Sequence, residues 1–210
     1  MPIIKYENNT GYTWAIWEIT ESEGVLAELA SLNSDEKTEL SLIKHPNKRV
    51  EFLAGRLVLK EIVVKRNKEF SGIYKDDCGK PHLVNCTGAI SLSHSFPLAG
   101  AIIHEGEFAG IDIEKPQAKL VKIAPKFLSK EESKKAGLNE VRLCIYWCAK
   151  ETLYKIYGRR QLLFSENIFV DPFETEMEGI TYGQIALPQH KKIHKLRYLN
   201  MGSHIICFNI

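Results

Sequence analysis

A chain of 210 residues is long enough for one large domain or two small ones, and 44% hydrophobic with 26% charged residues is typical of a globular protein. A net charge of +2 argues against a general nucleic-acid binder, since such proteins usually carry a strong basic excess. The sequence shows neither a signal peptide nor an apolar run that could span a membrane, and its 5 cysteines are scattered, so we expect a cytoplasmic protein without disulfides.

The first part of the chain predicts a strand followed by two helices. Residues 12–19 alternate and are rich in strand-forming residues. A helix then begins near Ser34 or Asp35, either of which can cap it. Residues 47–66 carry an apolar helical stripe, with Arg56 on a more polar side. That side is either an anion-binding face or an ordinary solvated one.

Polar turns and a further strand follow these helices. Residues 76–81 combine aspartate, glycine and proline, which is turn chemistry. Residues 89–95 alternate as a strand that ends in a polar tip. The hydroxyl and imidazole at this tip can donate to phosphate oxygens, or they can satisfy a turn. The residues of interest in this region are Lys75, Lys80, Ser93 and His94.

Two acidic residues alternate with isoleucines at the start of the second half. Residues 98–104 and 108–113 are predicted to pair as a hairpin joined at residues 105–107. In the second of these strands, Asp112 and Glu114 point to the same face. Two carboxylates on one face repel each other unless water or a cation separates them. An ordinary solvated strand face is the alternative.

A long helix is predicted over residues 139–157, with Gly158 as its C-terminal cap. Trp147, Glu151 and Lys155 share one face of it, because residues four apart lie almost in line. A carboxylate beside a cation on a half-sheltered face suits a metal or phosphate site, and an ion pair over a core tryptophan is the alternative. Together with the two strand carboxylates, Glu151 makes three oxygen donors, which suit Mg²⁺.

A weak internal repeat organises the whole chain. Residues 54–60 can be aligned with residues 149–155, and in each half a long helix precedes a set of strands. We therefore predict an α+β fold of two similar α/β subdomains, residues 1–105 and 106–210, related by a pseudo-twofold axis with the ligand cleft between them. The last strands are expected at residues 168–170, 180–187, 195–199 and 205–209.

The chain contains four short motifs in this order: Gly79-Lys80-Pro81, Leu92-Ser93-His94-Ser95, Gly110-Ile111-Asp112-Ile113-Glu114 and Trp147-x-x-Lys150-Glu151-Thr152-x-x-Lys155. Together these motifs resemble those of the 4′-phosphopantetheinyl transferase superfamily. The chain is long enough for the two-halved type that activates peptide and polyketide synthetases, since the single-domain acyl-carrier synthases are much shorter. After the long helix, residues 158–161 (Gly-Arg-Arg-Gln) depart from the Gly-x-Gly-Leu of many relatives.

The resemblance implies Mg²⁺-dependent transfer of the 4′-phosphopantetheine arm from coenzyme A to a serine of an apo carrier protein, with release of adenosine 3′,5′-bisphosphate. The length and the weak repeat lead us to expect a monomer, and the charge and the lack of a long apolar run lead us to expect no binding to nucleic acid or membrane. A Mg²⁺-dependent nucleotide phosphohydrolase and a non-catalytic module that binds coenzyme A or a carrier are the alternatives. By resemblance, Asp112, Glu114 and Glu151 would bind Mg²⁺, Glu151 and Lys155 would be catalytic, Lys150 and Lys155 would meet the diphosphate, and Arg56, Lys75, Lys80, Ser93 and His94 would hold the nucleotide and its phosphates.

Overall fold

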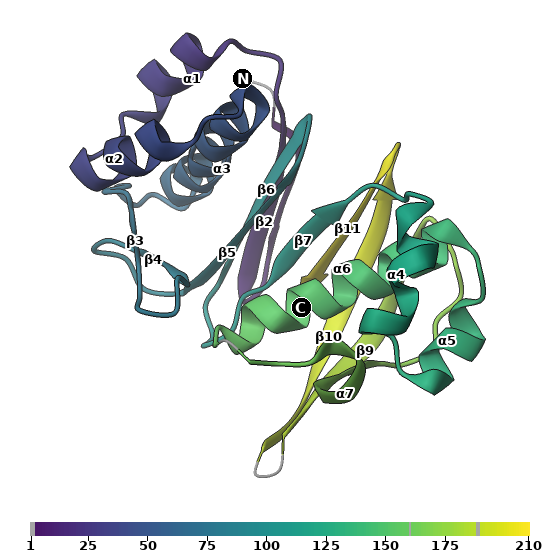
Figure 1. Cartoon of the computed structure of the whole chain (residues 1–210). Helices are drawn as coiled ribbons and strands as arrows, with labels where there is room; N and C mark the ends of the chain where they lie inside the picture. The colour runs from purple at the N-terminus through teal and green to yellow at the C-terminus, as the bar shows by residue number, and fades with distance from the viewer. Residues whose placement is uncertain (1–2, 160, 188–189) are drawn as a thin grey trace. The chain divides into compact units, whose positions relative to one another are not determined.

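The computed structural model describes residues 3–159, 161–187 and 190–210, and the chain divides into a first unit that ends at Phe108 and a second that begins at Ala109 (Figure 1). The predicted boundary lay slightly earlier, between residues 105 and 106. All 5 cysteines lie in the described ranges, and they are free thiols. Over these same ranges, none of the helices combines the length and the apolar character needed to cross a bilayer.

The first unit is built on a four-stranded antiparallel sheet with strand order β1-β2-β6-β5. Three helices follow β2, and a separate two-stranded hairpin, β3-β4, precedes β5 (Figure 1). The strands are β1 (Ile3–Asn9), β2 (Tyr12–Glu18), β3 (Ile73–Lys75), β4 (Pro81–Leu83), β5 (Ala89–Ser95) and β6 (Leu98–His104), and the helices are α1 (Glu23–Ala30), α2 (Ser34–Leu42) and α3 (Pro46–Lys65).

The core of the first unit lies between α3 and the sheet. Apolar residues of α3, among them Leu53 and Leu57, pack with Trp17 of β2 and Ile103 of β6, and all four are buried. Burying each such side chain contributes about 1.5–3 kcal/mol, so the apolar stripe of α3 fixes the helix on the sheet.

The predicted N-terminal cap of α2 was wrong by one or two residues. Asn33, not Ser34 or Asp35, caps α2: its side chain accepts a hydrogen bond from the backbone N–H of Glu36, and the Glu36 carboxylate accepts one from the backbone N–H of Asn33. This reciprocal arrangement is a capping box, which the Asn-Ser-Asp-Glu run contains in its sequence.

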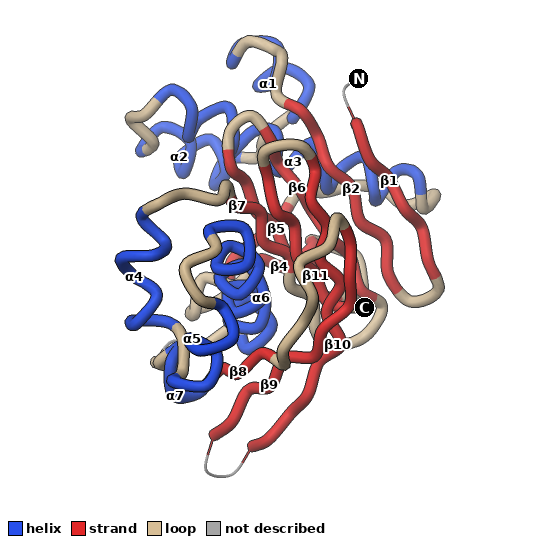
Figure 2. Tube along the Cα trace, turned by 90° about the vertical axis from the view of Figure 1, so that its right-hand side faces the viewer, coloured by secondary structure: helices blue, strands red, loops and turns tan. Residues whose placement is uncertain are grey.

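The second unit holds a five-stranded antiparallel sheet in the order β7-β11-β10-β9-β8. Its long helix α6 packs on β7 and β11, and shorter helices surround α6 (Figure 2). The strands are β7 (Ile111–Glu114), β8 (Ile168–Val170), β9 (Glu178–Leu187), β10 (His190–Met201) and β11 (His204–Asn209), and the helices are α4 (Lys119–Phe127), α5 (Lys130–Ala136), α6 (Glu140–Tyr157) and α7 (Phe164–Asn167).

The predicted hairpin between residues 98–104 and 108–113 was wrong. β6 pairs with β2 and β5 in the first unit, whereas β7 pairs with β11 in the second. The turn-like residues 105–107 therefore connect two sheets. Alternation and glycine identify strands and turns, but they do not say which strand is the partner.

The two units share a connectivity. In each, a strand (β2 or β7) leads into helices that include the longest helix of the unit (α3 or α6), and the unit's final strand (β6 or β11) pairs antiparallel with the strand that precedes these helices. This shared order agrees with the internal repeat seen in the sequence. The pseudo-twofold relation between the units stays a prediction.

Candidate active site

A cluster of carboxylates and one lysine lies where α6 faces β7 within the second unit. Trp147 Nε1 donates a hydrogen bond to Glu114 Oε1 at 3.4 Å, and Lys155 Nζ donates to Asp112 Oδ1 at 2.8 Å. Lys155 Nζ also donates to the backbone oxygen of Ile111 at 2.8 Å. The helix therefore runs antiparallel to the strand, with Glu151 between Trp147 and Lys155 on the shared face. The four-residue spacing of a helix predicts the shared face of Trp147, Glu151 and Lys155, and the two-residue period of a strand predicts that both carboxylates of β7 point to one side.

The three carboxylates interact electrostatically. The pKa of Glu151 is raised to about 7, mainly by burial and next by the charge of Asp112. The charge of Lys155 lowers this pKa, and the charge of Glu114 raises it by a smaller amount. The pKa of Glu114 is also raised, first by burial and then by Asp112, against the Trp147 hydrogen bond and the charges of Lys119 and Lys155. A carboxyl group with a pKa near neutral pH can accept and release a proton under working conditions, as a general base must.

The donor chemistry of this cluster fits Mg²⁺. All three candidates offer carboxylate oxygens, which Mg²⁺ prefers, and a divalent cation would relieve the mutual repulsion that raises the pKa values of Glu114 and Glu151. In the described part of the chain, no three Asp, Glu, His or Cys side chains converge closely enough to enclose an ion. Lys155 instead neutralises Asp112, so a bound ion requires these side chains to rearrange.

Gly110 lets β7 approach α6 closely enough to form this cluster. A Cβ atom at this position would lie 2.4 Å from the backbone oxygen of Thr152 and 2.9 Å from Ile156 Cγ1. The backbone of Gly110 is also held by Asn209, whose Oδ1 accepts from the Gly110 N–H at 2.8 Å. A side chain does not fit here, which gives the glycine of the Gly-Ile-Asp-Ile-Glu motif a steric reason.

The structure places Lys150 away from this cluster, in the interior of the second unit. Its side chain is fully buried. The ammonium group donates to Glu132 Oε2 at 2.7 Å, to the Phe164 oxygen at 2.9 Å and to the Ile168 oxygen at 2.5 Å. An ammonium group has three N–H bonds, and all three are used. Lys150 was predicted to contact the diphosphate, and these three hydrogen bonds give it a structural role instead.

Four of the five nucleotide-binding residues expected in the first unit line one pocket of about 480 Å³. The fifth, Lys80, lines a second pocket of about 370 Å³, and Pro81 lines both. Burial lowers the pKa of Lys80, and Asp76 opposes this effect. The four that share the larger pocket are Arg56, Lys75, Ser93 and His94.

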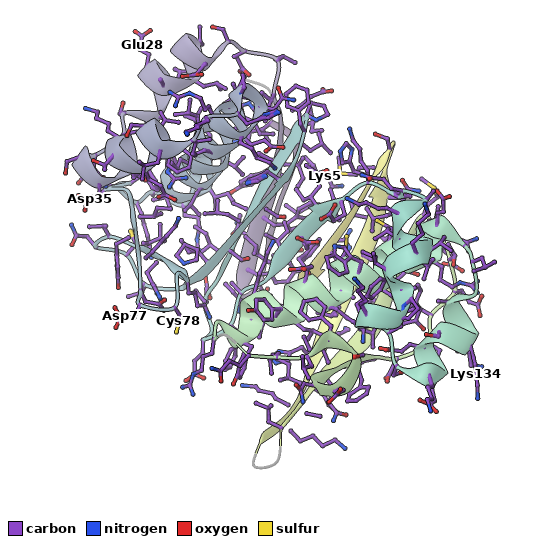
Figure 3. The ribbon with its side chains drawn as sticks, viewed as in Figure 1. Lys5, Glu28, Asp35, Asp77, Cys78 and Lys134 are labelled. Atoms are coloured by element: carbon purple, nitrogen blue, oxygen red, sulfur yellow. The ribbon has the colours of Figure 1, made fainter. Side chains whose placement is uncertain are left out.

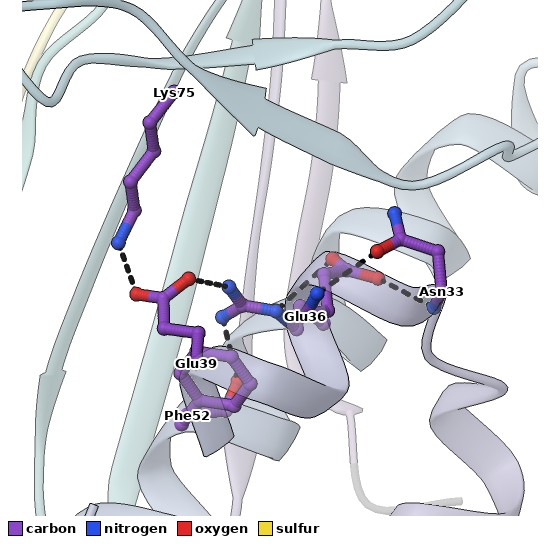
Figure 4. A network of polar contacts seen from close by, with 6 residues as sticks. Asn33, Glu36, Glu39, Phe52 and Lys75 are labelled. Atoms are coloured by element: carbon purple, nitrogen blue, oxygen red, sulfur yellow. Dashed lines mark hydrogen bonds and ion pairs between the residues drawn. The ribbon is translucent and has the colours of Figure 1, made fainter. Parts of the chain in front are cut away.

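Arg56 is held in the wall of this pocket by its neighbours (Figure 4). Its Nε donates to Glu36 Oε1 at 3.1 Å and its Nη2 to Glu39 Oε2 at 3.2 Å, while its guanidinium group lies 3.2 Å from the centre of the Phe52 ring. Burial lowers the pKa of Arg56, and the charges of Glu36 and Glu39 raise it. Lys75 pairs with the other oxygen of Glu39.

The pocket also contains acidic residues that the sequence analysis missed. Glu51 is buried, and its Oε1 accepts a hydrogen bond from the Phe96 backbone N–H at 2.8 Å. Its Oε2 lies 2.8 Å from Lys48 Nζ and 3.2 Å from His94 Nδ1. Glu51 could have been recognised in the sequence as a candidate site residue, because it is a glutamate within an otherwise apolar helical stripe. For Glu39, the signal was its spacing three residues after Glu36, which puts both on one helix face.

The family model of the 4′-phosphopantetheinyl transferase superfamily matches residues 109–208. The matched range contains the whole carboxylate cluster and covers nearly all of the second unit. This match supports membership of the chain in the 4′-phosphopantetheinyl transferase superfamily, as the four sequence motifs had indicated. Its members are transferases. No curated protein matches the sequence.

Proposed function

We propose that the protein transfers the 4′-phosphopantetheine arm of coenzyme A to a serine of an apo carrier protein, in a Mg²⁺-dependent reaction that releases adenosine 3′,5′-bisphosphate. The observation that supports this most directly is the cluster of Asp112, Glu114, Glu151 and Lys155 between β7 and α6, inside the matched unit.

Phosphoryl-type transfer requires carboxylates that can bind a metal ion and a cation that can stabilise phosphate charge, and this cluster contains both kinds of group. The serine oxygen forms a bond to the phosphorus of the phosphopantetheine, and the bond from that phosphorus to the bridging oxygen of the diphosphate breaks. Mg²⁺, when bound by Asp112, Glu114 and Glu151, would supply positive charge for the diphosphate oxygens.

Two side chains of the cluster have a further part in the proposed reaction. Glu151, whose pKa is raised to about 7 in the metal-free protein, takes the serine proton as the new bond forms. Lys155 is half-buried on the same helix face and can exchange its contact with Asp112 for a phosphate oxygen, where its charge stabilises the departing bisphosphate.

We further propose that the pocket of the first unit holds the nucleotide part of coenzyme A. Ser93 and His94 lie at the end of β5 and line the pocket together with Lys48 and Lys75. Hydroxyl, imidazole and ammonium groups are donors suited to phosphate oxygens. The free cysteines agree with a reducing compartment, and we propose that the protein acts in the cytoplasm as a monomer.

The test is the intact mass of an apo carrier protein after incubation with the enzyme, coenzyme A and Mg²⁺. A gain equal to one phosphopantetheine arm is expected, and a chelator should abolish it. Coenzyme A cleavage without any carrier would identify a phosphohydrolase instead. Binding of coenzyme A with neither outcome would identify a non-catalytic module.

A further inference from the structure

The cations of the first unit's pocket are already paired with a carboxylate of the same chain. Glu39 lies on α2, and its two oxygens meet two different cations: Oε2 accepts from Arg56 Nη2 at 3.2 Å, and Oε1 pairs with Lys75 (Figure 4). All three residues line the pocket. A phosphate group entering this pocket would therefore compete with Glu39 for the same donors.

The three carboxylates around this pocket differ in how firmly they are held. Glu51 is 3% exposed in its side chain and accepts from a backbone N–H, and Glu36 is 5% exposed and completes the capping box of α2. The Glu39 side chain is 37% exposed, and it forms ion pairs with the two cations. Displacing Glu36 or Glu51 would break the local fold, whereas displacing Glu39 breaks ion pairs that water can replace.

We propose that Glu39 is an intramolecular occupant of the anion-binding pocket, which a phosphate-bearing ligand displaces from Lys75 and Arg56. The inference rests on the proposed function, since it assigns this pocket to the phosphates of coenzyme A and of the bisphosphate product. Glu39 then sets the affinity of the pocket: it neutralises the pocket when no ligand is bound and weakens the binding of every phosphate ligand.

The charges explain why such an exchange can occur in both directions. A phosphate monoester carries close to two negative charges at neutral pH, so it attracts the two cations more strongly than one carboxylate does. The carboxylate returns when the ligand leaves, because Lys75 and Arg56 would otherwise remain uncompensated. Competition of this kind lowers affinity without removing a contact, and it favours release of the bisphosphate after transfer.

The test uses Glu39→Gln and direct calorimetric titration with adenosine 3′,5′-bisphosphate, without carrier protein. Glutamine keeps the shape and an oxygen acceptor for Arg56, but it loses the charge that competes with phosphate. We expect the Kd to fall about three- to tenfold, the scale of partly exposed ion pairs. The matched control is Glu28→Gln, which makes the same change of charge on exposed α1 (Figure 3) and should leave the Kd unchanged.

Two further variants keep the test decisive. Glu39→Asp is too short to meet both cations and should also tighten binding, which covers the case that Glu39→Gln does not fold. In a Lys75→Met background the gain from Glu39→Gln should shrink, because one of the released cations is missing. An unchanged or weaker affinity in the Glu39 variants, an equal gain in Glu28→Gln, or no bisphosphate binding by any form overturns the inference.

This binding experiment separates the inference from the proposed reaction. If Glu39→Gln tightens bisphosphate binding but no carrier protein gains mass, the pocket inference stands and the proposed transfer fails. If transfer occurs and the affinity does not respond to Glu39, the transfer stands and the inference fails.

Discussion

At the scale of single residues, the site depends on how Glu151 differs from Asp112. Both are proposed Mg²⁺ ligands, but Glu151 has its pKa raised to about 7, and only Glu151 is assigned a proton transfer. Asp112→Ala weakens the metal site, so excess Mg²⁺ should restore part of the rate by mass action. Glu151→Gln keeps an oxygen donor but removes the base, and we expect a loss of about a hundredfold to ten-thousandfold that Mg²⁺ does not restore.

Titration of Mg²⁺ against turnover for the two variants measures this difference. Coenzyme A binding should change much less than turnover in Glu151→Gln, because the phosphate contacts remain. Near-full turnover of Glu151→Gln at high Mg²⁺ would mean that Glu151 is a ligand alone and that another group takes the serine proton.

The raised pKa of Glu151 also predicts how stability depends on pH when Mg²⁺ is removed by a chelator. The folded protein keeps this proton up to about pH 7, whereas the ordinary value of the group is 4.5. Between these values the folded state binds more protons than the unfolded chain, so the free energy of unfolding falls as the pH rises from 4.5 to about 7. Urea unfolding across this range should show the fall, and Glu151→Gln should flatten it. If the free energy of unfolding falls equally with pH in the wild type and in Glu151→Gln, groups other than Glu151 cause the fall.

The sequence predicted part of the site at this scale, for identifiable reasons. Asp112 and Glu114 follow from the two-residue period of a strand, and Glu151 with Lys155 from the four-residue spacing of a helix. The position of Lys150 could not be predicted, because its partners Glu132, Phe164 and Ile168 come from three other elements. Helical spacing shows which way a side chain points, but not what it meets.

At the scale of elements, Lys150 and Glu132 join four elements of the second unit. Glu132 caps α5 through Ser129, accepts from Lys150 of α6, and accepts from the Val170 N–H of β8 at 2.8 Å. Lys150 adds contacts to α7 and to the start of β8. The bridge therefore fixes the position of α6, on which Glu151 and Lys155 are carried.

Lys150→Met should lower the free energy of unfolding by about 3–5 kcal/mol, because it leaves the buried Glu132 charge without its partner. The control is Lys134→Met on the exposed side of α5 (Figure 3), which should change stability by less than about 0.5 kcal/mol. Denaturant unfolding measures both. If Lys150→Met is as stable as the wild type and instead raises the KM for coenzyme A, the lysine contacts substrate and our correction is wrong.

The strands show where prediction from sequence ends at this scale. β5, β6 and β8 were predicted with the bounds that the structure shows, because alternation and flanking turn residues are local signals. β1 was missed, and β6 and β7 were paired with each other although they belong to different sheets. A strand and its partner in these sheets can be separated in sequence by long helices. A window of neighbouring residues therefore does not contain both strands of a pair, and it cannot identify the partner.

At the scale of the whole molecule, each unit has a sheet and a buried core of its own. The core of the first unit includes Trp17, Leu57 and Ile103, and the second unit buries Tyr146, Leu153 and Phe208. Such units can open separately with different free energies, and a destabilising substitution then affects its own unit most.

We therefore expect Lys150→Met to speed amide hydrogen exchange in the second unit and much less in the first. Slowly exchanging amides of β9, β10 and β11 should lose protection by up to several thousandfold, since 3–5 kcal/mol corresponds to about two to four powers of ten at full opening. Amides of β2, β5 and β6 serve as the internal reference, and Lys134→Met as the control protein. An equal loss of protection in both sets of strands would show that the molecule unfolds as one cooperative unit, and the effect of Lys150 would then extend to the nucleotide pocket as well.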